Sequence, residues 1–256
     1  MTLPGSFNRF LCLLACAGLL GFAPAAHAWD WNLGWGGKTV KGSGVAKTET
    51  RPVSGYTRIS LSIPAQVEIV QGSSEGLTIE GDDNIVPLVE TVVENGGLKI
   101  RFAEKNLSTS SKLLKVVVNA KYIDGLSVAG AGDLHAANLK SPVLKASIAG
   151  SGDVKIDRLD AESLIVSIAG SGNFAAGGKA KAVETKVAGS GDLKIGRLEA
   201  NDVKVSVAGS GDATVWARES LKVSVAGSGD VKYYGDAKVS QSVAGSGSVK
   251  RLGTAP

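Results

Sequence analysis

Acidic residues recur at a regular spacing in the second half of this chain. Five aspartates and one asparagine stand 18 to 20 positions apart, each directly after a Gly-Ser-Gly or Gly-Ala-Gly triplet: Asp133, Asp153, Asn173, Asp192, Asp212 and Asp230. Carboxylates held at strand spacing repel one another unless water, hydrogen bonds, basic neighbours or cations compensate their charge. The row is therefore either a ladder of turn-forming residues or a calcium site.

Two features of the sequence favour the turn-forming ladder. Calcium-binding solenoids carry a nonapeptide motif at every turn, whereas here the motif occurs once in 18 to 20 residues and its last copy ends in Ser248. A lysine two residues further on can also place a basic column beside the acidic one, at Lys155, Lys194, Lys232 and Lys250. We therefore predict a structural ladder and assign no metal, cofactor or catalytic residue to it.

The acidic residue closes a seven-residue phrase that occurs seven times, as in Ser147-Ile-Ala-Gly-Ser-Gly-Asp153. A period near 20 built from short apolar runs and glycine turns indicates solenoid coils that stack on their neighbours. Alternation places Ala146 and Ile148 inside and Ser147 outside. The glycines are expected at corners with positive φ, where a Cβ is costly. The pattern predicts an all-β parallel β-helix with 18 to 20 residues and two or three short strands per coil.

The first 28 residues predict export. A single charge, Arg9, precedes an apolar stretch over residues 10–23, and the small-residue site Ala26-His27-Ala28 follows. This is the layout of a secretory signal peptide with cleavage after Ala28, and the stretch is shorter than the roughly 20 apolar residues that a membrane span needs. A single-pass anchor and lipidation of Cys16 are the alternatives.

The composition of the remaining 228 residues argues against catalysis and against nucleic-acid binding. Their 27 basic and 24 acidic residues are interspersed and give a formal charge of +3, which is no electrostatic footprint for nucleic acid. Both cysteines precede residue 29 and only His135 remains, so the usual nucleophiles, bases and zinc ligands are nearly missing. We expect no enzyme, no nucleic-acid partner and no transmembrane segment in the mature chain.

The mature chain divides into three segments. Residues 29–49 are a tryptophan- and glycine-rich leader or cap, residues 50–120 are irregular strands between turn signals, and residues 121–250 carry the regular repeats. Residues 85–95 have a short helix as the alternative, but Pro87 and the β-branched residues favour a strand. The lone His135 is expected at the surface, and Trp216 is either packed or a binding aromatic.

Several motifs resemble the head GIN domain family, which is described as the head region of autotransporter adhesins in bacterial envelopes. The resemblance covers roughly residues 50–250 and rests on Arg51-Pro-Val-Ser-Gly-Tyr56, Val67-Glu-Ile-Val-Gln-Gly72, Leu77-Thr-Ile-Glu-Gly-Asp-Asp-Asn84, Leu98-Lys-Ile100 and the repeated Ala-Gly-Ser-Gly-Asp. It implies a right-handed parallel β-helix and an extracytoplasmic role, and it brings no catalytic residues.

The sequence therefore predicts an exported, non-catalytic binding or structural module of the cell envelope, in the periplasm or on the outer surface of a Gram-negative bacterium. Its flat stacked faces would hold an envelope polymer or another protein, and its solenoid ends allow self-association. The alternative is a β-helical enzyme acting on a polysaccharide, for which the irregular cluster Glu80, Asp82 and Asp83 is the catalytic candidate.

Overall fold

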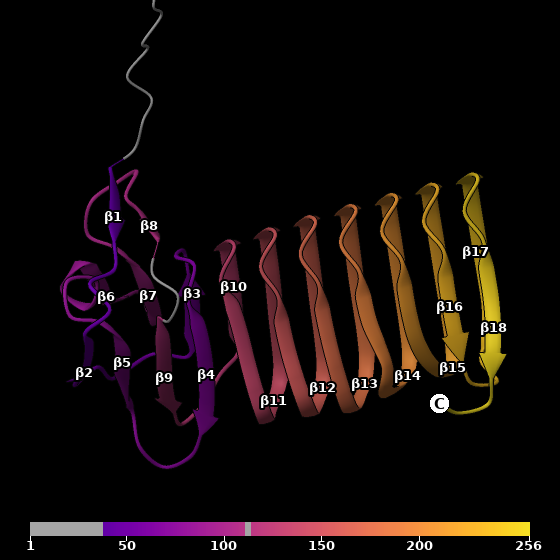
Figure 1. Ribbon diagram of the computed structural model, residues 1–256. Coiled ribbons are helices and arrows are strands. Elements are labelled where there is room, and N and C mark those ends of the chain that lie inside the picture. Colours follow the sequence, from indigo (N-terminus) through magenta and orange to yellow (C-terminus); the bar gives the residue numbers. More distant parts are fainter. Residues whose placement is uncertain (1–37, 111–113) are drawn as a thin grey trace, which may run out of the picture. The chain divides into compact units, whose positions relative to one another are not determined.

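The computed structural model describes residues 38–110 and 114–256, which form a parallel β-solenoid of about six turns preceded by irregular strands (Figure 1). The predicted all-β solenoid is thus confirmed. Within these ranges the only helical element is the short 3-10 turn η1 (Val86–Leu88). The predicted signal peptide over residues 1–28, and residues 29–37 of the expected leader, lie outside the described residues.

The N-terminal strands build an irregular cap over the first coil. β6 and β7 form an antiparallel hairpin whose turn uses positive φ at Asn95 and Gly96, so the predicted strand within residues 85–95 is present as β6 after η1. β3 and β4 stack in parallel on the first repeats, β10 (Gly125–Gly130) and β11 (Asp133–Gly150). The strands of this part are β1 (Thr39–Lys41), β2 (Ala46–Arg51), β3 (Arg58–Leu61), β4 (Gln66–Gln71), β5 (Gly76–Asp82), β6 (Val89–Glu94), β7 (Gly97–Phe102), β8 (Ser108–Ser110) and β9 (Lys115–Ala120).

The regular repeats stack in a register of whole coils, so that Ile148 pairs with Ile168 and Ile168 with Val187. Where two or three short strands per coil were expected, most coils form one long strand, with local register shifts such as that between Ile156 and Leu159. The strands are β10 (Gly125–Gly130), β11 (Asp133–Gly150), β12 (Val154–Gly170), β13 (Phe174–Gly189), β14 (Leu193–Gly209), β15 (Ala213–Gly227), β16 (Val231–Tyr234), β17 (Lys238–Gly245) and β18 (Val249–Gly253).

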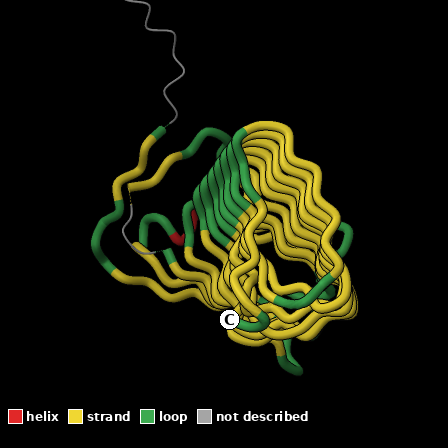
Figure 2. The backbone as a smooth tube through the Cα atoms, turned by 90° about the vertical axis from the view of Figure 1, so that its right-hand side faces the viewer, coloured by secondary structure: helices red, strands yellow, loops and turns green. Residues whose placement is uncertain are grey.

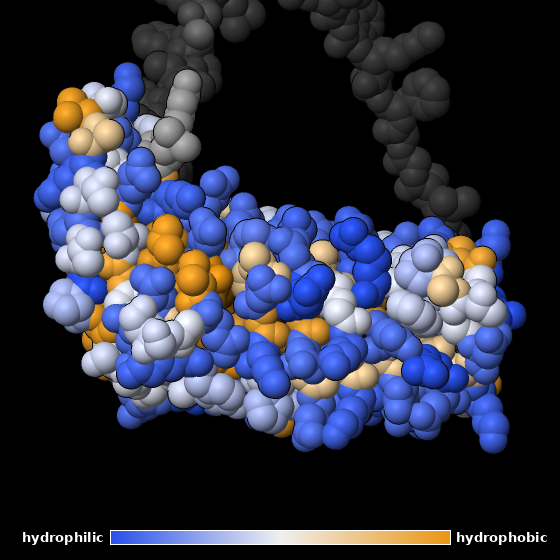
Figure 3. All heavy atoms as spheres, turned by 90° about the horizontal axis from the view of Figure 1, so that it is seen from below, coloured by the Kyte–Doolittle hydropathy of each residue, from blue (hydrophilic) through white to orange (hydrophobic). Residues whose placement is uncertain are grey.

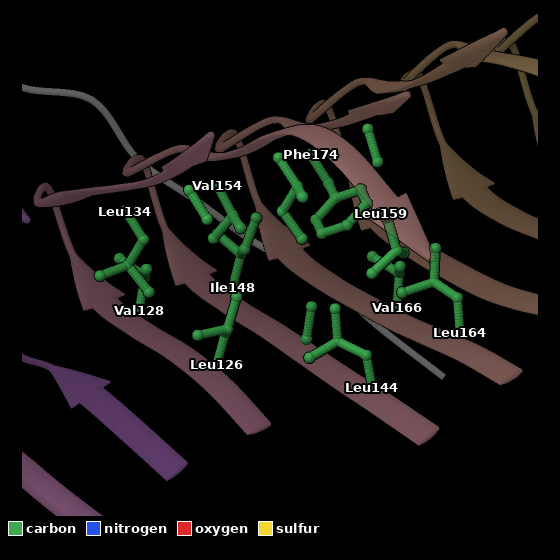
Figure 4. Close-up of a cluster of buried hydrophobic side chains, with 14 of the residues drawn as sticks. Leu126, Val128, Leu134, Leu144, Ile148, Val154, Leu159, Leu164, Val166 and Phe174 are labelled. Atoms are coloured by element: carbon green, nitrogen blue, oxygen red, sulfur yellow. The ribbon is translucent and has the colours of Figure 1, made fainter. Parts of the chain in front are cut away.

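Branched aliphatic side chains fill the interior in columns that run along the solenoid (Figure 4). Alternation sets the pattern, because Val166 and Ile168 are buried while Ser167 between them is exposed. Phe174 occupies the column of Val154, and its coil carries Gly178 where the neighbouring coil has Leu159. Burying each large aliphatic side chain contributes about 1.5–3 kcal/mol, so stacking supplies the stability that disulfides provide in many exported domains.

Each coil turns at its Gly-Ser-Gly corner, and these corners stack in one row (Figure 2). The first glycine of each corner has positive φ, for example +126° at Gly150 and +124° at Gly189, a region that costs any residue with a Cβ. The second glycine is required because its Cα lies against the preceding coil, and its φ is not in the left-handed region. A Cβ on Gly191 would lie 2.1 Å from the Gly172 carbonyl oxygen of the preceding coil.

Replacing this second glycine tests the close approach of coils. Gly191→Ala is expected to lower the free energy of unfolding by at least about 2 kcal/mol, because the added methyl must push apart two hydrogen-bonded coils. The neighbouring Ser190→Ala removes only an exposed hydroxyl and should stay within about 0.5 kcal/mol of the wild type. Urea unfolding followed by circular dichroism measures both, and equal stability of the two variants would contradict the packing argument.

Candidate functional site

The recurring acidic residues form a hydrogen-bonded ladder along one corner of the solenoid. In each step a side-chain oxygen accepts a hydrogen bond from the backbone N–H of the equivalent residue one coil further on. The N–O distances are 3.1 Å from Asp153 to Asp133, 2.8 Å from Asn173 to Asp153, 3.1 Å from Asp192 to Asn173, 3.2 Å from Asp212 to Asp192, 2.9 Å from Asp230 to Asp212 and 2.9 Å from Ser248 to Asp230.

At the corner a side-chain oxygen takes the place of a backbone acceptor. The carbonyl of Asp153 accepts from Leu134 N at 2.8 Å, in the preceding coil, whereas its own N–H is bound by the Asp133 carboxylate. At the start of the ladder Asp133 donates instead to the backbone carbonyl of Ala65, at 2.9 Å. One short polar side chain per coil thus satisfies a backbone donor that would otherwise need water.

Nearby basic and hydroxyl groups compensate the negative charge of two ladder carboxylates. Lys194 Nζ lies 3.2 Å from Asp192 Oδ2, as expected for a basic column beside the ladder. Lys155 Nζ instead lies 3.0 Å from Asp157 Oδ1, outside the ladder. The side-chain and backbone hydrogen bonds from Ser248 lower the pKa of Asp230 below its ordinary value of 3.8. Within residues 38–110 and 114–256, no three His, Cys, Asp or Glu side chains gather in a way that could hold a metal ion.

The irregular acidic cluster lies in the N-terminal cap, away from the regular coils. Asp82 accepts a hydrogen bond from Gly44 N at 2.8 Å, and Asp83 accepts one from the Ser43 hydroxyl at 2.5 Å. These contacts tie β5 to the β1–β2 connection. Glu80 and Asp82 also line a hollow of about 340 Å³ there, and Asp83 is not among its lining residues.

His135 lies in β11 at the surface beside a second hollow, of about 440 Å³. Its Nε2 is 2.9 Å from Asp157 Oδ2, and the carboxylate also binds Lys155. The hydrogen bonds from Lys155 and then from His135 lower the pKa of Asp157. Trp216 is half-buried and pairs with Tyr234 of the next coil, which leaves its two expected roles open.

A face made mostly of small side chains lies on the side of the coils that precedes the corner. Alanines in register occupy one column of this face and all of them are exposed: Ala129, Ala149, Ala169, Ala188, Ala208, Ala226 and Ala244. A parallel column two residues earlier holds Ser127, Ser147, Ser167, Lys186, Ser206, Ser224 and Ser242. We call these two columns the Ser/Ala face.

On the Ser/Ala face a column of methyl groups lies beside a column of hydroxyls. Within each column, neighbouring side chains are separated by the spacing of stacked strands, about 4.8 Å. Apart from Lys186, the side chains of this face are short, so a partner can approach the backbone over several coils. Seen from below Figure 1, the surface is mostly hydrophilic, and hydrophobic residues gather toward the N-terminal strands (Figure 3).

Comparison with known proteins identifies a family with this sequence pattern. The model of the family "Putative auto-transporter adhesin, head GIN domain" matches residues 55–237, well over half of the chain. The chain belongs to this family. The resemblance noted in the sequence is therefore confirmed, and the match includes the cap from Gly55 onward as well as most of the repeats.

Two solved structures are similar over nearly their whole length. One is a putative adhesin from Bacteroides fragilis, at 29% identity and TM-score 0.78, covering 83% of this chain and 100% of that one. The other is a putative lipid binding protein from Parabacteroides distasonis, at 26% identity and TM-score 0.72, covering 84% and 100%. No curated protein matches significantly. The described residues contain no helix with the length and apolar character to span a bilayer.

Sequence reasoning located the corner residues but missed two features of the surface. The Ser/Ala face follows from the same alternation that placed Ser147 outside, since Ala149 has the same parity, yet alanine alone gives no signal of exposure. The pairing of His135 with Asp157 joins residues 22 positions apart in consecutive coils. Only the register between coils, His135 against Lys155, brings them together.

Removing one side chain from the ladder should destabilise the protein modestly. Asp192→Ala leaves the Asp212 N–H without its acceptor and is expected to cost about 1 kcal/mol. Asp192→Asn keeps an acceptor oxygen, as Asn173 does naturally, and should stay within about 0.5 kcal/mol of the wild type. Thermal and urea unfolding measure both variants. A wild-type midpoint that rises with Ca²⁺ and falls with chelator would instead assign the ladder to metal binding.

The last step of the ladder predicts a dependence on acid pH. Because the folded state lowers the pKa of Asp230, this group stabilises the protein above about pH 4, and its contribution is lost as the pH falls through the folded pKa. Ser248→Ala removes the hydroxyl that contributes most to lowering the pKa of Asp230, so the variant should lose less stability than the wild type on acidification below about pH 4. Ser246→Ala is the control, and carboxyl NMR titration reads the pKa directly. An unchanged pKa in Ser248→Ala would contradict the assignment.

Proposed function

We propose that this chain is an exported, non-catalytic binding module of the bacterial cell envelope, in which the Ser/Ala face holds an extended polymer or the flat surface of another protein. The observation that carries the proposal is the uninterrupted column of seven exposed alanines beside a column of six serines and Lys186. Alanine methyls suit the apolar face of a sugar ring or a β-strand side chain, while the hydroxyls donate and accept hydrogen bonds.

The distribution of carboxylates supports binding rather than hydrolysis. A glycosidase normally works with two carboxylates placed across one scissile bond, whereas the ladder repeats a single carboxylate in equivalent positions and commits one oxygen of each to a backbone N–H. Two acids of the irregular cluster also hold a local connection of the cap. The related structures are described as a putative adhesin and a putative lipid binding protein.

Export is proposed from the first 28 residues together with the adhesin description of the family. The proposed organisation is a signal peptide over residues 1–28, a leader or cap over residues 29–49 and a head domain over residues 50–250. The periplasm and the outer cell surface both fit a module of this kind, because its described core relies on stacking and needs no reducing or metal-rich compartment.

Lengthening the alanine side chains tests the Ser/Ala face. Ala188→Gln/Ala208→Gln adds two neutral side chains that stand above the face in adjacent coils, and it should weaken binding about tenfold or more if a partner lies flat there. Co-sedimentation with purified envelope polysaccharides and with peptidoglycan sacculi provides the measurement. Ala137→Gln, at an exposed alanine outside the face, is the matched control.

Three outcomes decide the proposal. Binding that the double variant weakens and the control does not would support the face. Equal binding by both variants would move the site elsewhere on the molecule. Release of soluble sugar fragments from any polymer would contradict the non-catalytic assignment.

A further inference from the structure

The two ends of the solenoid differ in how they are covered. At the N-terminal end the cap stacks on β10 and β11. At the other end β17 pairs only with β15, and no described element lies beyond β17 and β18 (Figure 1). On the β18 side of the last coil, the Arg251 side chain donates hydrogen bonds to Gly235 O at 2.9 Å and to Asp236. The outer edge of β17 has no partner among the described residues.

Apolar side chains of the interior columns reach the surface at this edge. Val239 and Val243 are in register with Leu221 and Val225, which are 1% and 2% exposed, yet their own exposed fractions are 39% and 40%. Between them, Gln241 takes the position of Val223. An unpaired strand edge with exposed valines is a template for pairing with another chain.

The sequence of this edge is palindromic, Val239-Ser-Gln-Ser-Val243. The equivalent segments of the preceding coils are not, for example Leu221-Lys-Val-Ser-Val225 and Val203-Lys-Val-Ser-Val207. If two copies pair antiparallel about Gln241, each Val239 faces Val243 of the second copy and each Ser240 faces Ser242. A two-fold interface requires this kind of self-complementarity.

The charges along the edge agree with such pairing. The outward position that holds Lys204 and Lys222 in the two preceding coils holds Ser240 in the last one. From residue 239 to residue 245 the strand carries no charge, so antiparallel pairing about Gln241 places no like charges opposite one another. The Gln241 amide can both donate and accept a hydrogen bond, which lets the two copies bind each other on the axis.

From these observations we propose that the chain forms a two-fold dimer by antiparallel pairing of β17 with β17 of a second copy, centred on Gln241. The pairing continues the coil-to-coil interface between β15 and β17 across the axis. It covers Val239 and Val243 of both copies and joins two solenoids end to end, with their caps at the far ends. The dimer does not depend on the Ser/Ala face, so each proposal can fail without the other.

Sedimentation equilibrium of the full chain tests the dimer and its register. Val239→Lys/Val243→Lys places introduced lysines opposite one another and should weaken the dimer at least about tenfold. Val239→Lys/Val243→Glu removes the same two valines but places opposite charges together, and it should recover dimerisation. Val70→Lys/Val143→Lys changes two equally exposed valines elsewhere, 43% and 40%, and should leave the dimer unchanged.

Disulfide cross-linking provides a second test of where the two-fold axis lies. In a Cys12→Ser/Cys16→Ser background, Gln241→Cys should cross-link two copies on mild oxidation, because residues opposite each other in antiparallel strands lie within disulfide reach. Ser240→Cys should not, since it faces Ser242 of the second copy. A wild-type monomer at high concentration would overturn the proposal. So would a dimer that Val239→Lys/Val243→Lys leaves intact, or equal cross-linking of the two cysteine variants.

Discussion

The close approach of one coil to the next at the glycine corner is the constraint on which the rest of this structure depends. The carbonyl of Gly170 accepts hydrogen bonds from both Ser190 N and Gly191 N of the following coil, at 2.9 and 3.1 Å. At this spacing a Cβ on Gly191, the second glycine of the corner, would collide with the Gly172 carbonyl oxygen of the preceding coil. Because every coil turns with the same geometry, the flanking strands keep their register, the apolar side chains align in columns and the acidic residues meet the next backbone N–H.

The ladder shows how a repeated residue can suggest chemistry and yet have a local structural task. A row of five aspartates and one asparagine resembles a cation site in sequence, but a side-chain oxygen of each is held by a backbone donor of the next coil. Asn173 takes part with a neutral amide, so the requirement is an acceptor oxygen at the right distance rather than a negative charge. Function is then better sought on the sides of the coils than at their corners.

Much of the fold could be predicted from the sequence because the same pattern of apolar residues and glycines occurs seven times. The alternation of Ser147 with Ala146 and Ile148 fixes inside and outside, and the glycines fix the corners. The continuous strand through each coil could not be predicted, since the bend near Leu159 depends on small register shifts between coils. The pairing of His135 with Asp157 and the exposure of Val239 depend on which coil is the neighbour and which coil is last, and composition does not carry that information.

The ladder also has a direction. Each acidic side chain reaches toward the following coil, and the first one, Asp133, rests its own N–H on the cap through Ala65. The last carboxylate of the row, that of Asp230, therefore faces the final repeat and accepts hydrogen bonds from the N–H and the hydroxyl of Ser248. A further coil at the C-terminal end would need only a side-chain acceptor at the position of Ser248, whereas an insertion before Asp133 would have to rebuild the cap. Gain or loss of whole repeats near the C-terminal end is thus the least disruptive way for such a chain to change its length in evolution.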